Sequence, residues 1–372
     1  MTPENVQADE INEPSPAVVY RTGICPKNVS THATCPGGVA ASDVLIGDAL
    51  TGDALKNKVV AFKFGGSSLL GADRMLHAAG IVRSSTQSCS VVVVVSAMKG
   101  VTDRLLAVGS ALENGKFAVA REEADGVVNV HLSVLRDLQL EEADELRVRR
   151  EMQSLCRDLL HDVNNYSRPL AGTAELLDRL ASYGERLSAR LFAAALEKSD
   201  VAAVPVSSSD FVRTCETFRD ARPDLLETRQ RGRDVLLPLL EESLVPVVTG
   251  FIGATPDGRI TTLGRNSSDF SGALVAHVVD ADELVIWTDV DGIFTANPRD
   301  NQEARLLHEL SYDDAHALAK SGAKVLHASV LPLAAETEMV VWVRNTFNPA
   351  GRGTRIGPHA DLTSSSQDGG RA

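Results

Sequence analysis

The first residues with a recognisable chemical signature are a lysine and a pair of glycines. Lys63 lies near the end of a short β-branched and aromatic run, residues 59–64, and Gly65, Gly66 and Ser67 follow that run. Paired glycines let the backbone approach a ligand closely, and their amides can form a concavity that binds an anion. The lysine could then reach a phosphate. The segment lacks the spacing of a Walker A loop, so by itself it is equally compatible with a tight turn beside a surface lysine.

Two further junctions carry hydroxyl, guanidinium and carboxylate groups. Ser96 follows a run of valines, and Thr102 stands near the start of the next predicted helix. Hydroxyls at the carboxyl end of a parallel strand lie where open α/β sheets bind ligands, although helix capping alone would also explain Thr102. Arg265 precedes Asp269 after a glycine turn. The guanidinium indicates a clamp on a charged substrate group, whereas Asp269 alone is compatible with a helix cap.

A fourth junction is rich in aspartate and follows the predicted strand 283–287. Thr288, Asp289 and the Asp-Gly turn after them lack the ligand spacing of a calcium loop, so contacts to a nucleotide base or ribose are the better prediction. Further along, Lys324 offers a second lysine, and His327 is predicted to be structural rather than a general base. Chance would not readily place so many charged groups at successive glycine-rich junctions.

Composition and charge define the class of protein. The chain has 372 residues, of which 44% are hydrophobic, and a formal net charge of −13. Such an acidic protein is a poor candidate for binding nucleic acid or an anionic membrane through its overall field. Five scattered cysteines without a CxxC pair favour a reducing compartment over disulfides or zinc. No apolar run has the length of a membrane span or a signal peptide, so we expect a soluble cytoplasmic protein.

The elements that must position these groups alternate between strand and helix. Strands are predicted at 59–64, 90–95, 202–206, 245–249, 283–287 and 339–343. Helices are predicted at 72–83, 102–113, 176–197, 224–242, 269–279 and 311–321, and Asp257-Gly258 predicts a hairpin turn. This alternation is typical of α/β proteins, and we expect a three-layer α/β/α sandwich around a mainly parallel central sheet.

Three segments break the alternation. Residues 1–57 are rich in Pro and Gly and are predicted to be an extension with little structure of its own, or else an arm that packs on the core or on a partner subunit. Residues 117–165 are charged and leucine-rich at helical spacing. They predict a helical insertion, for which an ordinary solvated helical pair is favoured over a lid or dimer surface. Residues 358–372 are predicted to be a disordered tail.

Several segments, in this order, resemble the amino acid kinase family and, within it, the aspartate kinases. They are KFGGSS, VVVVVSAMKGVTD, YGERLSARL, TGFIG, LGRNSSD, WTDVDGIFTANPR, LSYDDAHALAKSGAKVLH and VRNTFNPAGRGT. The similarity runs from about Val59 to Ile356. It implies the amino acid kinase fold over residues 58–357, with an amino-acid-binding lobe up to about residue 245 and a nucleotide-binding lobe after it.

The resemblance also implies a role for each matching residue. Lys63, Asp269 and Lys324 would be catalytic: Lys63 would stabilise the phosphoryl group in flight and Asp269 would organise the lysines. The substrate pocket for L-aspartate would consist of Ser96, Thr102, Glu185, Phe251 and Arg265. Arg265 would hold a substrate carboxylate, and Glu185 would contact the ammonium group. ATP would contact Gly65, Gly66, Ser67, Thr288, Asp289, Phe294, Arg299 and Lys324.

The implied reaction transfers the ATP γ-phosphate to the β-carboxylate of L-aspartate and yields 4-phospho-L-aspartate and ADP. Mg²⁺ would bridge the β- and γ-phosphates of ATP, with no protein residue expected as its ligand. A carboxylate is a nucleophile at neutral pH, so the site needs charge neutralisation rather than a strong base. The resemblance implies a homodimer as well, and no nucleic-acid or membrane partner is expected.

The sequence also departs from the family pattern. Ala328, Ser329 and Val330 follow His327 where the family usually has Pro, Arg or Ala, and Thr or Ser, and Ser68 and Phe294 also differ from common family residues. Only about 16 residues follow Ile356, too few for an ACT regulatory domain, so we expect no feedback inhibition by lysine or threonine. The alternatives are a related kinase with another amino acid or small carboxylate as acceptor, and a catalytically silent regulatory subunit. The pathway is not determined by the sequence.

Overall fold

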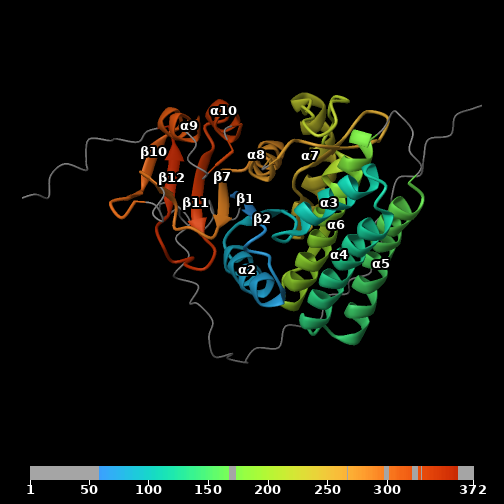
Figure 1. Cartoon of the computed structure of the whole chain (residues 1–372). Helices are drawn as coiled ribbons and strands as arrows, with labels where there is room; N and C mark the ends of the chain where they lie inside the picture. Colours follow the sequence, from blue (N-terminus) through green and yellow to red (C-terminus); the bar gives the residue numbers. More distant parts are fainter. Residues whose placement is uncertain are drawn as a thin grey trace, which may run out of the picture. The chain divides into compact units, whose positions relative to one another are not determined.

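An eight-stranded sheet organises the part of the chain that the structure describes (Figure 1). The computed structural model describes residues 58–166, 173–265, 267–296, 301–320, 326–327 and 329–358. All of them belong to one unit, residues 41–372. The extension predicted at residues 1–57 lies outside the described residues, as do residues 359–372 of the tail, Arg299, Lys324 and Ala328.

The sheet is mainly parallel, as predicted. Its strands follow the order β10-β12-β11-β7-β1-β2-β4-β3. The six strands from β11 to β3 are parallel, whereas β12 runs antiparallel to β11 at one end. The strands are β1 Val59–Phe64, β2 Ser90–Val95, β3 Ala203–Val206, β4 Val245–Thr249, β7 Glu283–Thr288, β10 Glu309–Ser311, β11 Val340–Asn345 and β12 Thr354–Gly357.

The central strands are apolar on both faces because helices cover both faces. Within β1, Phe62 belongs to one hydrophobic cluster and Ala61 to the other. Side chains of successive strand residues point to opposite faces, so the two clusters lie on opposite sides of the sheet. This burial on both faces explains the uninterrupted valine run of β2. The expected three-layer α/β/α sandwich is confirmed.

Different helices form the two layers that cover the sheet. One consists of α2 Ala72–Ser85, α3 Val101–Glu113, α4 Phe117–Asp137, α5 Glu142–Asn164 and α6 Thr173–Lys198. The other consists of α7 Leu225–Glu241, α8 Ser268–Val278, α9 Tyr312–Lys320 and α10 Val330–Glu336. Each predicted helix is present, and Ser311 caps α9 through a bond from the Asp314 backbone N–H to its Oγ, 3.1 Å long.

The predicted insertion is a pair of helices that joins the main core. Helix α4 packs on α3 and α5, and α5 packs on α6, as the green and teal ribbons of Figure 1 show. Ala124, Leu135, Met152 and Leu159 are buried between them. His131 is fully buried there, and desolvation lowers its pKa to about 4, although a hydrogen bond to the Val127 carbonyl partly offsets the shift. The imidazole is therefore neutral at physiological pH.

Several short elements were not predicted. They are η1 Ser208–Asp210, the antiparallel pair β8 Ile293–Phe294 and β9 Leu306–Leu307, the edge strands β10 and β12, and helix α10. The predicted hairpin turn at Asp257-Gly258 is confirmed, and it joins β5 Ile252–Ala254 to β6 Ile260–Thr262. Elements of two to seven residues are too short for a hydrophobic period to emerge. In addition, Pro332 argues against a helix at α10 in the sequence pattern, although a proline in the first turn is compatible with a helix.

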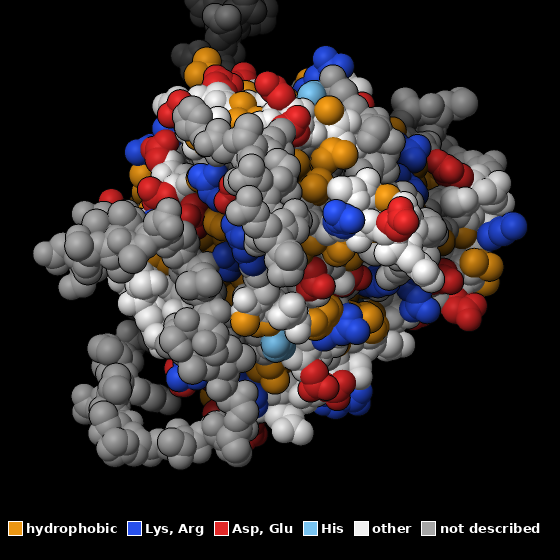
Figure 2. Space-filling view, turned by 90° about the vertical axis from the view of Figure 1, so that its left-hand side faces the viewer, with side chains coloured by type: hydrophobic (Ala, Val, Ile, Leu, Met, Phe, Trp, Pro, Cys, Tyr) orange, Lys and Arg blue, Asp and Glu red, His pale blue; other side chains and the backbone are white. Residues whose placement is uncertain are grey.

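Acidic and basic side chains are interspersed over the described surface that is visible in Figure 2. No extended basic patch gathers on the described part of that face, which agrees with the acidic overall charge of the chain. Among the described residues, no helix combines the length and the apolar character that a membrane span requires.

One buried ion pair lies at the amino ends of the central strands. Lys58 Nζ is 3.0 Å from Glu283 Oε1, and both side chains are only 9% exposed. Replacing Lys58 alone with Met should leave a buried carboxylate without its partner and lower the free energy of unfolding by about 3–5 kcal/mol. Urea denaturation measures this. The double variant Lys58→Met/Glu283→Leu should recover most of the loss, and failure to recover would contradict a loss due to the orphaned charge.

Candidate active site

The carboxyl ends of the central strands bring the predicted groups to one edge of the sheet. Lys63 lies next to Val94 of β2 and Ile286 of β7 in the sheet register. The residues that follow β1, β2 and β7 therefore emerge side by side. This is the edge at which parallel α/β sheets bind ligands.

Lys63 and Asp269 form a short ion pair. Lys63 Nζ is 2.6 Å from Asp269 Oδ1, and the two side chains are 10% and 17% exposed. Asp269 lies in the first turn of α8, whose N-cap residue, Ser267, makes no side-chain capping bond. The carboxylate thus serves as the partner of the lysine rather than as a helix cap. A charge-assisted contact of this kind holds the ammonium in one position.

The glycine turn after β1 is held between the neighbouring strand ends. The Gly65 backbone N–H donates to the Trp287 carbonyl over 3.2 Å, and the Lys99 N–H donates to the Gly66 carbonyl over 3.1 Å. A Cβ atom on Gly66 would lie 2.5 Å from the Ala97 carbonyl oxygen. Only glycine therefore permits this close approach of the two loops. The turn also contains Ser67, whose carbonyl accepts a bond of 2.7 Å from Arg74 Nη1.

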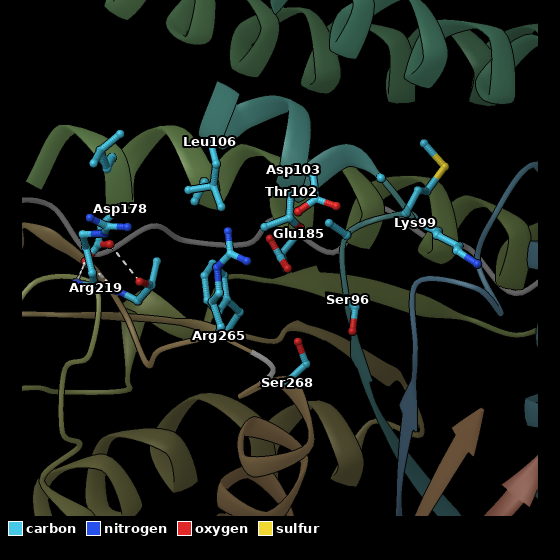
Figure 3. Close-up of a pocket in the computed structure, with 17 residues that line it drawn as sticks. Ser96, Lys99, Thr102, Asp103, Leu106, Asp178, Glu185, Arg219, Arg265 and Ser268 are labelled. Atoms are coloured by element: carbon cyan, nitrogen blue, oxygen red, sulfur yellow. Dashed lines mark hydrogen bonds between the residues drawn. The ribbon is translucent and has the colours of Figure 1, made fainter. Parts of the chain in front are cut away.

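A cavity of about 500 Å³ opens beside this turn (Figure 3). All five residues predicted for the substrate pocket line it: Ser96, Thr102, Glu185, Phe251 and Arg265. They come from five separate segments, namely the loop after β2, helix α3, helix α6, the turn after β4 and the loop before α8. The tertiary structure thus brings together side chains that lie far apart in the sequence.

Glu185 is the buried carboxyl group of this cavity. Glu185 is only 3% exposed to solvent. Burial raises the pKa of Glu185 to about 8, and a backbone hydrogen bond at Ala97 and the charge of Lys63 offset part of that rise. Its Oε2 atom has no hydrogen-bond partner among the described residues. Burying a carboxylate oxygen without a hydrogen-bond partner costs free energy unless a ligand supplies that partner. Glu185 is therefore suited to bind a cationic group.

Arg265 supplies a cation to the same cavity. Its side chain is exposed and forms no ion pair within the described part of the chain, and Figure 3 shows its guanidinium pointing into the cavity. Phe251 forms the wall nearby with an unusual backbone φ of 68°. The Phe251 N–H donates to Ser271 Oγ over 2.8 Å, which holds this strained turn in place.

The residues expected on the nucleotide side lie beyond the glycine turn. Thr288 ends β7, and its carbonyl accepts a bond of 2.8 Å from the Thr346 N–H. Asp289 follows directly, with its Oδ1 atom 3.4 Å from Thr288 Oγ1, and Phe294 lies in β8. None of the three lines the cavity that holds Glu185 and Arg265. The other two residues expected here, Arg299 and Lys324, lie outside the described residues.

The sequence analysis missed several residues of the cavity wall. They include Lys99, Asp103, Leu106, Asp178, Arg219, Thr262 and Ser268. Asp178 had a usable signal, because it precedes Glu185 by two helical turns and therefore lies on the same face of α6. Arg219 had none, since it lies in a loop whose course depends on contacts with distant segments.

The chain belongs to the amino acid kinase family, whose model matches residues 58–345. Within that family, its relatives include aspartokinases. Lysine-sensitive aspartokinase 3 of Escherichia coli is 35% identical over 300 residues, which cover 81% of this chain and 64% of the relative. Chloroplastic aspartokinase 1 of Arabidopsis thaliana is 32% identical over 319 residues, which cover 83% of this chain and 54% of the relative.

A solved structure agrees with this family assignment. The crystal structure of Escherichia coli aspartokinase III in complex with aspartate and ADP superimposes with a TM-score of 0.75 at 33% identity, covering 82% of this chain and 66% of that one. The chain therefore spans less than two thirds of the length of these relatives. The predicted aspartate kinase resemblance and the predicted fold are confirmed.

Two neighbouring glycines offer a matched test of the turn. In Gly66→Ala, the new methyl group would meet the Ala97 carbonyl, so we expect the free energy of unfolding to fall by about 1–3 kcal/mol. In Gly65→Ala, the nearest atoms would be 3.7 and 3.8 Å away, so the change should stay within about 0.5 kcal/mol. Chemical denaturation of both variants measures the difference. Equal stabilities would contradict the close approach at Gly66.

Proposed function

We propose that this chain is an ATP-dependent aspartate kinase that produces 4-phospho-L-aspartate and ADP. One observation carries the proposal: a buried carboxyl group and a guanidinium that forms no ion pair with a described residue share a cavity beside the Lys63–Asp269 ion pair. An α-amino dicarboxylate has a matching arrangement of one ammonium group and two carboxylates. The similarity to an aspartokinase that was crystallised with aspartate and ADP supports the same substrates here.

The cavity orients the acceptor through its two charged ends. Glu185 binds the ammonium group of aspartate, and Arg265 binds the α-carboxylate through paired hydrogen bonds. Ser96 and Thr102 complete the polar wall on the side of the glycine turn. The β-carboxylate is then directed toward Lys63. Such positioning converts a bimolecular encounter into a reaction within one complex.

The chain's own residues contribute electrostatics rather than base catalysis. The acceptor carboxylate is already ionised at neutral pH, and the barrier arises from its repulsion by the anionic phosphates. Lys63, fixed by Asp269, stabilises the charge that develops on the transferred phosphoryl group. The Gly66 amide lies beside it and binds a phosphate oxygen, whereas the Gly65 N–H already donates to the Trp287 carbonyl and instead fixes the turn. Thr288, Asp289 and Phe294, with Arg299 and Lys324, form the nucleotide side in this proposal.

Mg²⁺ fits this arrangement as an ion carried by the nucleotide. Among the described residues, no three acidic, histidine or cysteine side chains form a cage for a cation. Mg²⁺ in kinases usually takes only one or two protein carboxylates and completes its coordination with phosphates and water. Asp289, at the end of β7, is a carboxylate within the proposed nucleotide site. When bound, the ion neutralises phosphate charge.

The proposed reaction can be tested directly. Purified protein with Mg-ATP should release ADP only when L-aspartate is present, and hydroxylamine should trap the acyl phosphate as a hydroxamate. Turnover with a different carboxylate, but not with aspartate, would favour a related amino acid kinase. Absence of turnover with every acceptor would contradict the proposal. The cytoplasmic location and the homodimer remain predictions.

Lys63 provides the sharpest test of the catalytic assignment. Lys63→Met keeps the length of the side chain but removes the charge, so we expect kcat to fall by a factor of about 10²–10³ or more. Because the lysine acts on the transferred group, the KM for aspartate should change much less. Lys116→Met, at an exposed site before α4, serves as the matched control. Steady-state kinetics at a temperature at which both variants remain folded would decide, and an unchanged kcat for Lys63→Met would refute the assignment.

The raised pKa of Glu185 predicts that substrate binding depends on pH. Its pKa is raised to about 8 by burial, so the free protein holds this carboxyl mostly protonated near pH 6.5. Binding of an ammonium group selects the carboxylate, and aspartate binding must therefore release a proton. The apparent Kd should rise by up to tenfold for each pH unit as the pH falls from 8 to 6.

Calorimetry in buffers of different ionisation enthalpy measures the proton release, and Glu185→Gln is the control. That variant should bind aspartate more weakly, with no proton release and a flat Kd between pH 6 and 8. A wild-type Kd that does not vary with pH would show that Glu185 is ionised before the substrate arrives.

A further inference from the structure

The outer wall of the cavity contains an arginine in an unfavourable backbone conformation. Arg219 has a φ of 74°, a region in which glycine is much preferred over residues with a side chain. Its side chain nevertheless lines the cavity. Strained residues of this kind cluster at ligand-binding sites, where surrounding contacts over-determine them. We therefore expect the arginine side chain at this position to have a function that glycine could not provide.

A buried carboxylate holds this strained backbone in place. Asp178 of α6 is 2% exposed. Its Oδ2 atom accepts bonds of 2.8 Å from the backbone N–H groups of both Arg219 and Thr262, and its Oδ1 atom accepts a third bond of 2.8 Å from Thr262 Oγ1. These three bonds join α6, β6 and the loop that carries Arg219. All three hydrogen bonds of the carboxylate thus go to Arg219 and Thr262 without using the Arg219 guanidinium, whose charge acts on Asp178 only through electrostatic attraction.

The rest of the loop is anchored from the outside. Arg259 Nη2 lies 3.0 Å from Glu216 Oε1, and the Arg259 guanidinium stacks 5.3 Å from the centre of the Phe218 ring. Arg259 also pairs with Glu175 near the start of α6, over 3.6 Å. The segment before Arg219 is therefore tied to α6 and to the β5–β6 hairpin. These contacts hold the segment that leads to Arg219 beside the cavity.

Two cationic side chains consequently line one side of the cavity. Figure 3 shows Arg265 between Arg219 on one side and Glu185 and Thr102 on the other, with Asp103 beside Thr102. Arg219 forms no ion pair with any described residue. Asp178 balances part of the Arg219 charge, and two guanidinium groups in one cavity are stabilised further when an anion lies between them. The arrangement is thus complementary to a carboxylate held away from the reacting end.

The size of the cavity fits this interpretation. About 500 Å³ is within the range of about 300–1,000 Å³ that small-molecule sites occupy. Leu106 and Ala181 contribute apolar side chains to the wall of the cavity. The polar groups beside the glycine turn and the two arginines can therefore bind opposite ends of one acceptor molecule.

We propose that Arg219 is a specificity-determining residue that binds, together with Arg265, the carboxylate of the acceptor that does not react. The inference rests on the proposed function, and it defines the acceptor class as α-amino dicarboxylates. Asp178 acts through Arg219 as a positioning residue. Because the contact is the same in the ground state and in the transition state, it contributes to KM rather than to kcat.

The test compares three variants of the full chain. Arg219→Gln should raise the KM for L-aspartate by about 10- to 100-fold, the range expected for loss of a charge-assisted hydrogen bond, and leave kcat within a factor of about three. Arg219→Gly should have the same effect while its thermal midpoint stays unchanged or rises, because glycine relieves the strain. Arg222→Gln, an exposed arginine three residues further along the loop, should leave KM unchanged.

A second substrate analogue separates a direct contact from a change in cavity shape. The compound 3-aminopropanoate keeps the ammonium group and the reacting carboxylate of aspartate but lacks the other carboxylate. Its inhibition constant against aspartate should be the same for wild type and for Arg219→Gln. An unchanged KM for aspartate in that variant, or an equal loss of affinity for both compounds, would overturn the inference.

Failure of the proposed function would be recognised separately. If the wild type binds aspartate without turning it over, the kinase proposal fails, and calorimetric affinities of the wild type and Arg219→Gln for aspartate and 3-aminopropanoate then test Arg219 alone. Selective loss of aspartate binding in the variant would support its role. A wild type that does not bind aspartate would overturn the inference together with the proposed substrate.

Discussion

The site depends on one buried ion pair, between Lys63 at the end of β1 and Asp269 in the first turn of α8. A buried ammonium group is stable only beside a partner, so strand and helix must meet closely. Gly272 permits this, because a Cβ atom there would already lie 3.2 Å from Lys63 Cβ. The central position of β1 between β2 and β7 then places the lysine between the neighbouring strand ends. Loss of this geometry would separate the two halves of the site.

The ion pair also divides the edge of the sheet into two regions with different chemistry. On the β2 and β4 side, a cavity combines Glu185 with Arg265 and suits a zwitterionic acceptor. On the β7 side, Thr288 and Asp289 offer polar groups next to the glycine turn. The proposed product is an acyl phosphate, which water hydrolyses readily, so exclusion of water from the acceptor pocket is a chemical advantage. The helices α4 and α5 support α3 and α6, which form one wall of that pocket.

Much of this site was predictable because parallel strands align their carboxyl ends at one edge of a sheet. Lys63, Ser96 and Thr288 each follow a buried apolar run, so their proximity follows once the sheet is inferred. Glu185 was different: it lies in the middle of a long helix, and only the resemblance to the aspartate kinases indicated its role. Short elements such as α10 were missed because seven residues do not establish a helical period.

The sequence by itself determined the class of protein, the order of strands and helices, and the segments that carry charge, because local patterning sets these properties. The tertiary structure decided which of those groups meet. The pairing of Lys63 with Asp269 depends on how α8 packs on the sheet. Likewise, the place of Arg219 depends on three hydrogen bonds from Asp178, which lies in another element. Contacts between distant segments have no local pattern, and for this reason the second arginine of the cavity emerged only from the folded chain.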